Sequence, residues 1–341
     1  MSKVSAGSQA KLFAGIDVSA KTLAVAVQRE DEEGFERREF PNSKPGRKQL
    51  VRWLLKSKSA VRVALEATGI YSLDVALALD QAGGIEVAVL NPKTANRFAQ
   101  TLCRSKTDKA DAVALSEYSL RMRFAPWRRP AENALELRQI SRYITALAQE
   151  HTRAHNRLHA AQASAATPRC VRDDIKRSMA DLKQRMAELR RHAVALVRKD
   201  AELEQKFRQL VAVPGIAEAS AVQLLGELAG LDPEMTVRQW VAHSGLDPAH
   251  QMSGSSVHKP SRISRHGNRH LRRALYMPAL VGARFDQHMK AFYTLLQARH
   301  KTKLQALMAV ARKLLHAIFG IFKTNTPYDG RKLFPQLHIP A

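Results

Sequence analysis

The chain has few cysteines, no long apolar run and comparatively few acidic residues. Its 341 residues include two cysteines, Cys103 and Cys170, with no CxxC pair. This argues against a zinc site or a disulfide framework and fits a reducing cytoplasm. No run approaches the roughly 20 apolar residues of a membrane span, and Met1–Lys11 lack the apolar core of a secretory signal. We therefore expect a cytoplasmic protein with no membrane partner.

Acidic residues are strongly outnumbered by basic ones. The chain holds 55 Lys and Arg against 31 Asp and Glu, a formal net charge of +24 at pH 7. Such a surplus is typical of proteins that bind polyanions, although a solvated basic surface is the plainer alternative. Hydrophobic residues make up 45% of the chain, and the length predicts two or three domains at roughly 150 residues each. The composition thus favours a globular protein that binds nucleic acid.

Four of the acidic residues lie where a charge is costly. Asp17 follows the apolar run LFAGI, Glu66 follows VRVAL, and Asp108 and Asp111 are three residues apart on an expected helix. Desolvating a carboxylate is expensive unless a cation compensates it, and hard oxygen ligands favour Mg²⁺, with Mn²⁺ as the other choice. Because residues three apart share one helical face, we predict that all four bind one metal site that assists phosphoryl transfer.

The order of strands and helices predicts the fold around these acids. Strands are expected at 12–16, 22–28, 35–40, 61–65 and 86–90, with helical spacing of apolar residues between the later ones. This is the α/β pattern of a mixed sheet and the order of an RNase-H-like fold, in which the first strand carries an acid at the sheet centre. We predict a metal-binding catalytic domain at residues 10–130.

Two long apolar seams follow. Leu137 to Ala161 and Ile175 to Leu196 alternate spacings of three and four, with Thr167-Pro168 breaking the helix between them. They predict an antiparallel helical hairpin or coiled coil over 131–208. The second helix could instead pair with a copy from another subunit.

The last part, 209–330, is expected to be mostly helical and to carry a turn at Val213–Ile216 like that of a helix-hairpin-helix. Backbone N–H groups at such a turn bind phosphate, which makes Gly215 a candidate contact, although Pro-Gly turns are also common in ordinary packing. A serine-rich segment, SGSS at 253–256, then opens a strongly basic stretch. Its cations could clamp a phosphodiester near a nucleophilic serine, or the stretch could be a solvated loop. With Lys106 and Gly215, the predicted nucleic-acid contacts are Lys259, Arg262, Arg265, Arg269, Arg272 and Arg273.

Six blocks of the sequence together resemble one family, the Piv/MooV DNA invertases and the related insertion-sequence transposases. The blocks DKAD and RRALYM discriminate best. All six occur in the family's order and span nearly the whole chain: GIDV at 15–18, LEATGIY at 65–71, KTDKADA at 106–112, VPGI at 213–216, SGSS at 253–256 and LRRALYM at 271–277.

The resemblance implies a RuvC-like domain whose DEDD tetrad is Asp17, Glu66, Asp108 and Asp111, a coiled-coil insertion, and a C-terminal transposase domain. It also implies that Ser253 is the nucleophile of a bacterial, nucleoid-associated recombinase. The resemblance further implies a structured noncoding guide RNA, encoded by the element itself, that base-pairs with target and donor DNA. One departure is Ala217, where a second glycine is common, and it weakens the phosphate-turn assignment.

The expected function is Mg²⁺-dependent strand cleavage and exchange through a phosphoserine–DNA intermediate. Since Ser253 is far from the tetrad in sequence, their meeting requires domain closure or donation by a partner, which favours a dimer or tetramer. The alternative is a Holliday-junction-type endonuclease that uses the same acids with water as nucleophile. A non-catalytic nucleic-acid scaffold is a third reading.

Overall fold

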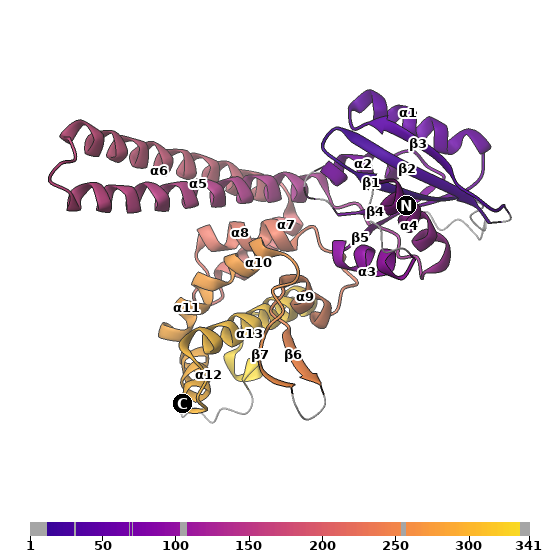
Figure 1. The fold of residues 1–341 in the computed structure, drawn as a ribbon. Helices are drawn as coiled ribbons and strands as arrows, with labels where there is room; N and C mark the ends of the chain where they lie inside the picture. The colour runs from indigo at the N-terminus through magenta and orange to yellow at the C-terminus, as the bar shows by residue number, and fades with distance from the viewer. Residues whose placement is uncertain are drawn as a thin grey trace. The chain divides into compact units, whose positions relative to one another are not determined.

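The computed structural model divides the chain into two units between Arg129 and Pro130 (Figure 1). It describes residues 12–30, 32–67, 69, 71–102, 108–253 and 257–334, without the side chains of 108–109 and 250–261. The second unit therefore contains both the helical hairpin and the helices after it. A further domain division at residue 208 stays a prediction.

The first unit is built on one five-stranded sheet in the order β3-β2-β1-β4-β5. The central strand β1 runs antiparallel to β2 and parallel to β4, which is parallel to β5. The predicted mixed α/β sheet is confirmed. The elements are β1 (Leu12–Val18), β2 (Thr22–Arg29), β3 (Glu36–Pro41), α1 (Lys44–Leu54), a 3₁₀ turn (Leu55–Ser57), β4 (Val61–Glu66), α2 (Tyr71–Asp80), β5 (Ile85–Leu90), α3 (Pro92–Leu102) and α4 (Asp108–Arg121).

Helix α3 is not among the elements that the sequence predicts, and it begins at Pro92. Proline lacks an N–H group and has a fixed φ, so it suits the first turn of a helix, where that N–H group would have no partner in the helix. The backbone N–H of Ala95 donates to the Asn91 carbonyl over 3.0 Å. The same two residues thus end β5 and begin α3.

Helix α4 lies directly on the central strand because residue 15 is glycine. A Cβ atom at Gly15 would lie 2.1 Å from the Ala112 carbonyl oxygen and 2.2 Å from the Ser116 nitrogen. The buried Ser116 hydroxyl donates to the Phe13 carbonyl oxygen over 2.9 Å. Both contacts attach α4 to the backbone of β1.

The second unit is mostly helical. Its elements are α5 (Glu132–Ala163), α6 (Arg169–Arg198), α7 (Ala201–Val211), α8 (Glu218–Leu228), α9 (Val237–Ser244), β6 (Pro248–Ser253), β7 (Val257–Ile263), α10 (Arg269–Ala274), α11 (Tyr276–Phe285), α12 (Gln287–Ala298), α13 (Lys303–Thr324) and α14 (Gly330–Leu333).

Helices α5 and α6 pair with each other along their lengths within one chain (Figure 1). Across the hairpin, Arg185 of α6 donates to the Tyr143 hydroxyl of α5 over 2.7 Å. The seam residue Leu182 is buried, whereas Val171, near the start of α6, is 44% exposed. Of the two pairings that the sequence allowed, the structure shows the one within the chain.

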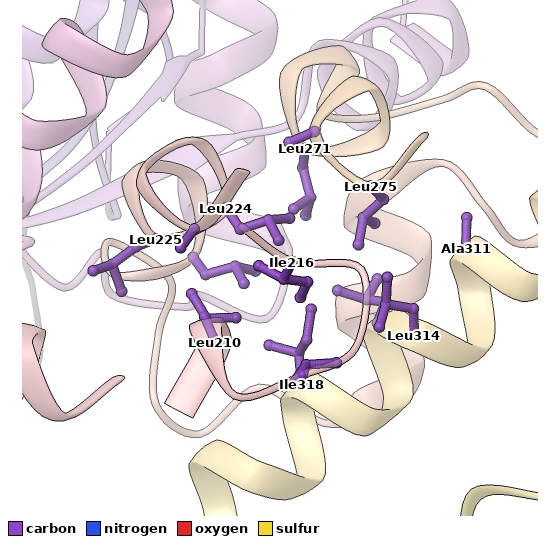
Figure 2. Packing of buried hydrophobic residues seen from close by; sticks show 14 of the residues in the cluster. Leu210, Ile216, Leu224, Leu225, Leu271, Leu275, Ala311, Leu314 and Ile318 are labelled. Atoms are coloured by element: carbon purple, nitrogen blue, oxygen red, sulfur yellow. The ribbon is translucent and has the colours of Figure 1, made fainter. Parts of the chain in front are cut away.

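The base of the hairpin shares a core with the helices that follow it (Figure 2). Leu210, Leu224, Leu271, Leu314 and Ile318, from four different helices, are all fully buried there. Helix α13 is the one described helix long and apolar enough to cross a membrane. Since its apolar face packs in this core, packing accounts for its composition.

The segment around Ser253 differs from expectation. The sequence predicts no strand here, but β6 and β7 form an antiparallel two-stranded ribbon in which Ser253 pairs with Val257. A register shift lies between Ala249 and Gln251. Residues 254–256 of the serine block lie outside the described residues.

We expect Gly15→Ala to lower the free energy of unfolding by about 1–3 kcal/mol, because the added methyl group must push α4 off β1. The change would be measured by urea unfolding. Gly320→Ala is the matched control, since nothing lies within 4 Å of a Cβ at that helical glycine. It should be neutral or stabilising by up to about 1 kcal/mol. Equal stability of Gly15→Ala and the wild type would contradict the close approach.

Candidate active site and nucleic-acid interface

Asp17 and Glu66 lie side by side at one end of the sheet. In the parallel pairing of β1 with β4, Ile16 is opposite Leu65, so the next residues along both strands are these two acids. Each is half-buried. In parallel sheets, ligands bind at the carboxyl ends of the strands, which is where both acids lie.

Both acids face helix α4. The Cβ position of Gly15 points at the α4 backbone, and residues two apart on a strand share a face, so Asp17 points the same way. Ala64, two residues before Glu66, packs with Leu115 of α4. The half-buried Asp111 precedes Ala112, whose carbonyl oxygen is the closest atom to the Gly15 Cβ position. Asp111 therefore lies on the helix that covers the sheet face to which Asp17 and Glu66 point.

The donor set fits a hard divalent cation, because it consists of carboxylates alone. Asp108 begins α4, but its side chain is outside the described set. Among the described side chains, no group of three His, Cys, Asp or Glu lies close enough to hold a metal ion. Metal binding by the four acids therefore stays a prediction.

Five of the predicted arginines line one groove in the second unit, together with Lys301 and Arg312, which the sequence analysis missed. The groove has a volume of about 720 Å³ and runs between the foot of the ribbon and helices α10 to α13. The five predicted arginines in its lining are Arg262, Arg265, Arg269, Arg272 and Arg273.

The remaining predicted nucleic-acid contacts are Lys106, Lys259 and Gly215. Lys106 lies outside the described residues, as does the side chain of Lys259 on β7. Gly215 has φ +88°, and a Cβ there would lie 2.6 Å from the Pro278 carbonyl oxygen. Close packing of the turn against α11 is therefore a sufficient reason for glycine at this position. Phosphate binding at the turn stays a prediction.

Arg272 also has a structural role. Its Nη1 donates to the Ser244 carbonyl oxygen over 2.8 Å, at the end of α9, where Gly245 has φ +68°. Burial, and then the nearby charge of Arg265, lower the pKa of Arg272. The guanidinium therefore lines the groove and also provides a hydrogen-bond donor for a carbonyl group at the C-terminal end of α9.

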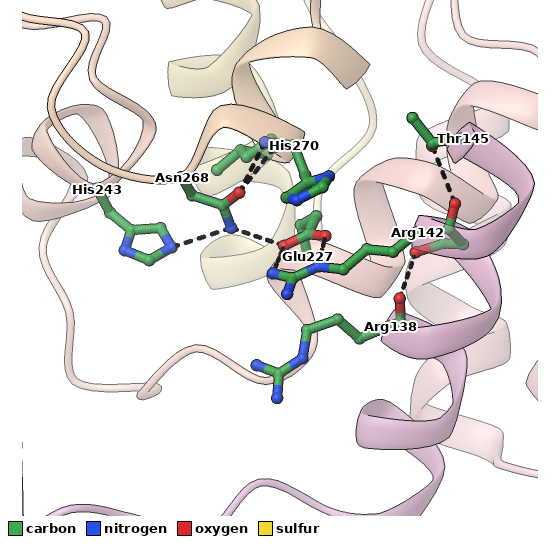
Figure 3. A network of polar contacts seen from close by, with 9 residues as sticks. Arg138, Arg142, Thr145, Glu227, His243, Asn268 and His270 are labelled. Carbon is green, nitrogen blue, oxygen red and sulfur yellow. Dashed lines mark hydrogen bonds and ion pairs between the residues drawn. The ribbon is translucent and has the colours of Figure 1, made fainter. Parts of the chain in front are cut away.

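A buried ion pair holds the arginine-bearing helix α10 in place (Figure 3). The Glu227 side chain is 2% exposed and accepts two hydrogen bonds from Arg142 of α5, over 2.7 and 2.8 Å. It accepts a third from Asn268 Nδ2 over 2.6 Å. The Asn268 Oδ1 in turn accepts from the His270 and Leu271 backbone nitrogens and caps α10. One carboxylate thus links α5, α8 and α10.

Burial shifts the pKa of several groups in this network. Burial alone would raise the pKa of Glu227, but hydrogen bonds from Arg142 and Asn268 outweigh it, and the net shift is downward. Burial lowers the pKa of His243, whose Nε2 lies 3.4 Å from Asn268 Nδ2. Burial and then Arg142 lower the pKa of His270. Both histidines are therefore biased toward the neutral form.

This network is not predicted from the sequence. A signal was present, since Glu227 is a charge within the apolar helix EASAVQLLGEL, and buried charges are paired. Gly226 beside it also marks a close approach, because a Cβ there would lie 2.5 Å from the Ser141 hydroxyl of α5.

Two family models match the chain. A DEDD-type model described as a transposase matches residues 14–164, and a model described as the transposase IS116/IS110/IS902 family matches residues 208–294. The two ranges together cover most of the chain.

Individual relatives agree with these models. The pilin gene-inverting proteins of Moraxella bovis and Moraxella lacunata are each 27% identical over 332 residues, which is 94% of this chain and 98% of theirs. An uncharacterized 43.6 kDa protein of insertion element IS110 from Streptomyces coelicolor is 30% identical over 122 residues, or 36% of this chain and 30% of that protein.

The sheet and the DEDD-type match define the first unit as an RNase-H-like domain, which indicates dependence on a divalent metal. The chain belongs to the IS110 family of transposases and DNA invertases, and it is a DNA-binding recombinase. The resemblance seen in the sequence is confirmed.

We expect Glu227→Gln to lower the free energy of unfolding at pH 7 by about 3 kcal/mol, because Arg142 loses its buried counter-charge. Since the folded pKa of Glu227 lies below its ordinary value of 4.5, its contribution is complete above that value. It is lost as the pH falls below 4.5 through the folded pKa. The wild type and the variant should therefore converge in acid.

Urea unfolding at pH 7 and in steps below pH 4.5 measures this difference. Glu218→Gln, which changes an exposed glutamate at the start of the same helix, is the control and should cost less than about 0.5 kcal/mol. A difference between Glu227→Gln and the wild type that does not change with pH would contradict an ionised Glu227.

Proposed function

We propose that this recombinase cuts and rejoins the DNA of an insertion sequence at a metal-assisted site, through a covalent phosphoserine–DNA intermediate. The observation that carries the proposal is the contact of α4 with β1 at Gly15, which lays the helix that carries Asp111 over the strands that carry Asp17 and Glu66. Half-buried carboxylates at the end of a sheet are costly without a cation.

Asp17, Glu66, Asp108 and Asp111 would hold Mg²⁺, or Mn²⁺ in its place. The chemistry that the ion supplies when bound is stabilisation of the charge that develops on the scissile phosphate. Within the RNase-H-like class, we assign this domain to the RuvC-like type. The carboxylates of β1 and β4 provide a rigid part of the site, because both strands belong to the sheet.

Ser253 is the nucleophile in this mechanism. Its Oγ forms a bond to phosphorus while the bond from phosphorus to the 3′ oxygen breaks, so the serine proton is lost and the leaving oxygen gains one. The product is a 5′ phosphoserine and a free 3′ hydroxyl group. A 3′ hydroxyl group of another strand then attacks the phosphoserine, which restores the serine and rejoins DNA without external energy.

The remaining assignments rest on the resemblance and on the charge of the chain. Lys106, Gly215, Lys259 and the groove arginines contact the nucleic-acid backbone, with Gly215 in a helix-hairpin-helix-like turn. The partners are the element ends, target DNA and a noncoding guide RNA.

The hairpin of α5 and α6 acts as a coiled-coil domain over 131–208, before a transposase domain over 209–330. The protein works as a dimer or tetramer in the bacterial cytoplasm, on the nucleoid.

We expect the wild type, incubated with Mg²⁺, its element's flanking RNA and end-labelled DNA, to give a protease-sensitive protein–DNA band after denaturation. Ser253→Ala should abolish the band because it removes the attacking oxygen. Asp17→Asn, Glu66→Gln and Asp111→Asn should reduce it by at least about 100-fold, as expected on losing a metal ligand.

Two controls separate the roles. Ser255→Ala tests the choice of serine within the block and should retain the band. Asp80→Asn removes an exposed acid of α2 and should change nothing. Cleaved DNA without attached protein, unaffected by Ser253→Ala, would contradict the serine mechanism and favour the junction endonuclease that uses water.

A further inference from the structure

We propose that the groove of the second unit binds an unpaired DNA strand next to the cleavage point, with bases against its apolar wall and phosphates on its arginines. This inference deepens the proposed function and depends on the role of Ser253 given there. The groove's volume of about 720 Å³ lies within the roughly 300–1,000 Å³ of ligand pockets.

The charge of the groove selects a polyanion. Its lining includes six arginines and Lys301 and no aspartate or glutamate. Among the residues that the structure describes, none of these seven cations forms a salt bridge with a carboxylate. Such a concentration of unneutralised positive charge is unfavourable unless an anion with several charges compensates it.

The groove's apolar wall favours an unpaired strand over a duplex as the ligand. Tyr276 is 39% exposed and Leu304 is 57% exposed, and both line the groove with Phe292 and Met308. A duplex presents phosphates and sugars at its surface and keeps its base faces stacked. Aromatic and apolar side chains instead stack with the faces of unpaired bases. Arginines beside an apolar wall therefore match a single strand better than a double helix.

The ribbon connects the groove to Ser253. Pro248 and Ile263, opposite each other at the foot of the ribbon, line the groove, and Ser253 lies five residues along β6 from Pro248. At roughly 3.3 Å per residue, the serine backbone is about 17 Å from the groove. A strand bound in the groove is thus a few nucleotides from the nucleophile, which favours the cleaved DNA strand over the guide RNA as occupant.

The helix that carries three of these cations, and one of its guanidinium groups, are held before any ligand arrives. Asn268 caps this helix and is itself held by Glu227, while Arg272 is bound to the Ser244 carbonyl oxygen. Preorganised side chains lose less entropy on binding. The position of α10 and the Arg272 guanidinium are therefore fixed before a strand binds.

The test is binding of full-length protein in EDTA, which prevents cleavage, to fluorescein-labelled (dT)₁₂, a duplex of 12 base pairs and (rU)₁₂, measured by fluorescence anisotropy. We expect tightest binding to (dT)₁₂. Tyr276→Ala should weaken (dT)₁₂ binding about tenfold, as expected on losing one stacked base, and duplex binding less than about twofold. Arg312→Gln should weaken both and reduce the salt dependence.

Matched controls lie outside the groove on α11. Phe285→Ala removes an aromatic ring that is 81% exposed, and Arg284→Gln removes an exposed cation. Neither should change (dT)₁₂ binding by more than about twofold. Thermal unfolding checks that each variant is folded.

Several results would overturn the inference: duplex binding as tight as (dT)₁₂ binding, tighter binding of (rU)₁₂, or equal effects of Tyr276→Ala and Phe285→Ala. If the phosphoserine–DNA band still forms in those cases, the proposed function stands and only the groove assignment fails. No binding of any of the three probes would count against the groove and the proposed function together.

Discussion

The close approach of helix α4 to strand β1 is the constraint on which the first unit depends. With Gly15 at the crossing, the backbones of the two elements meet without an intervening side chain, and Ser116 bonds to the strand carbonyl of Phe13. This contact places α4, which carries Asp111, on the sheet face to which Asp17 and Glu66 point. A larger residue at position 15 would move the helix that carries Asp111 away from the strands that carry the other two acids. The glycine therefore controls the placement of α4, although it contributes no ligand.

In the second unit the constraint concerns cations, because six arginines and Lys301 line one groove. A single buried carboxylate, Glu227, fixes Arg142 on one side and Asn268 on the other, and Asn268 caps the helix that carries three groove arginines. Gly226 permits the close packing of α5 and α8 at the same point. The buried acid thus fixes the start of the helix that carries three arginines of the groove.

Elements with a local sequence pattern were predicted, and contacts between residues distant in sequence were missed. The strands before Asp17 and Glu66 were predictable because their apolar runs are continuous, and the hairpin helices because their seams repeat. The ribbon of 248–263 was missed, since its residues are polar and a two-stranded pairing has little local signature. The Glu227 network was missed because Arg142 lies 85 residues away and Asn268 lies 41 residues away. The groove, too, exists only where the ribbon's foot meets helices distant in sequence.

The most direct measurement of the central claim is anomalous diffraction from crystals of the protein soaked in Mn²⁺. The account predicts an anomalous peak within coordination distance of the Asp17, Glu66 and Asp111 carboxylates, with the site lost in Asp17→Asn crystals. Manganese bound elsewhere, in a protein that still cleaves DNA, would contradict the claim that these acids form the metal-assisted site.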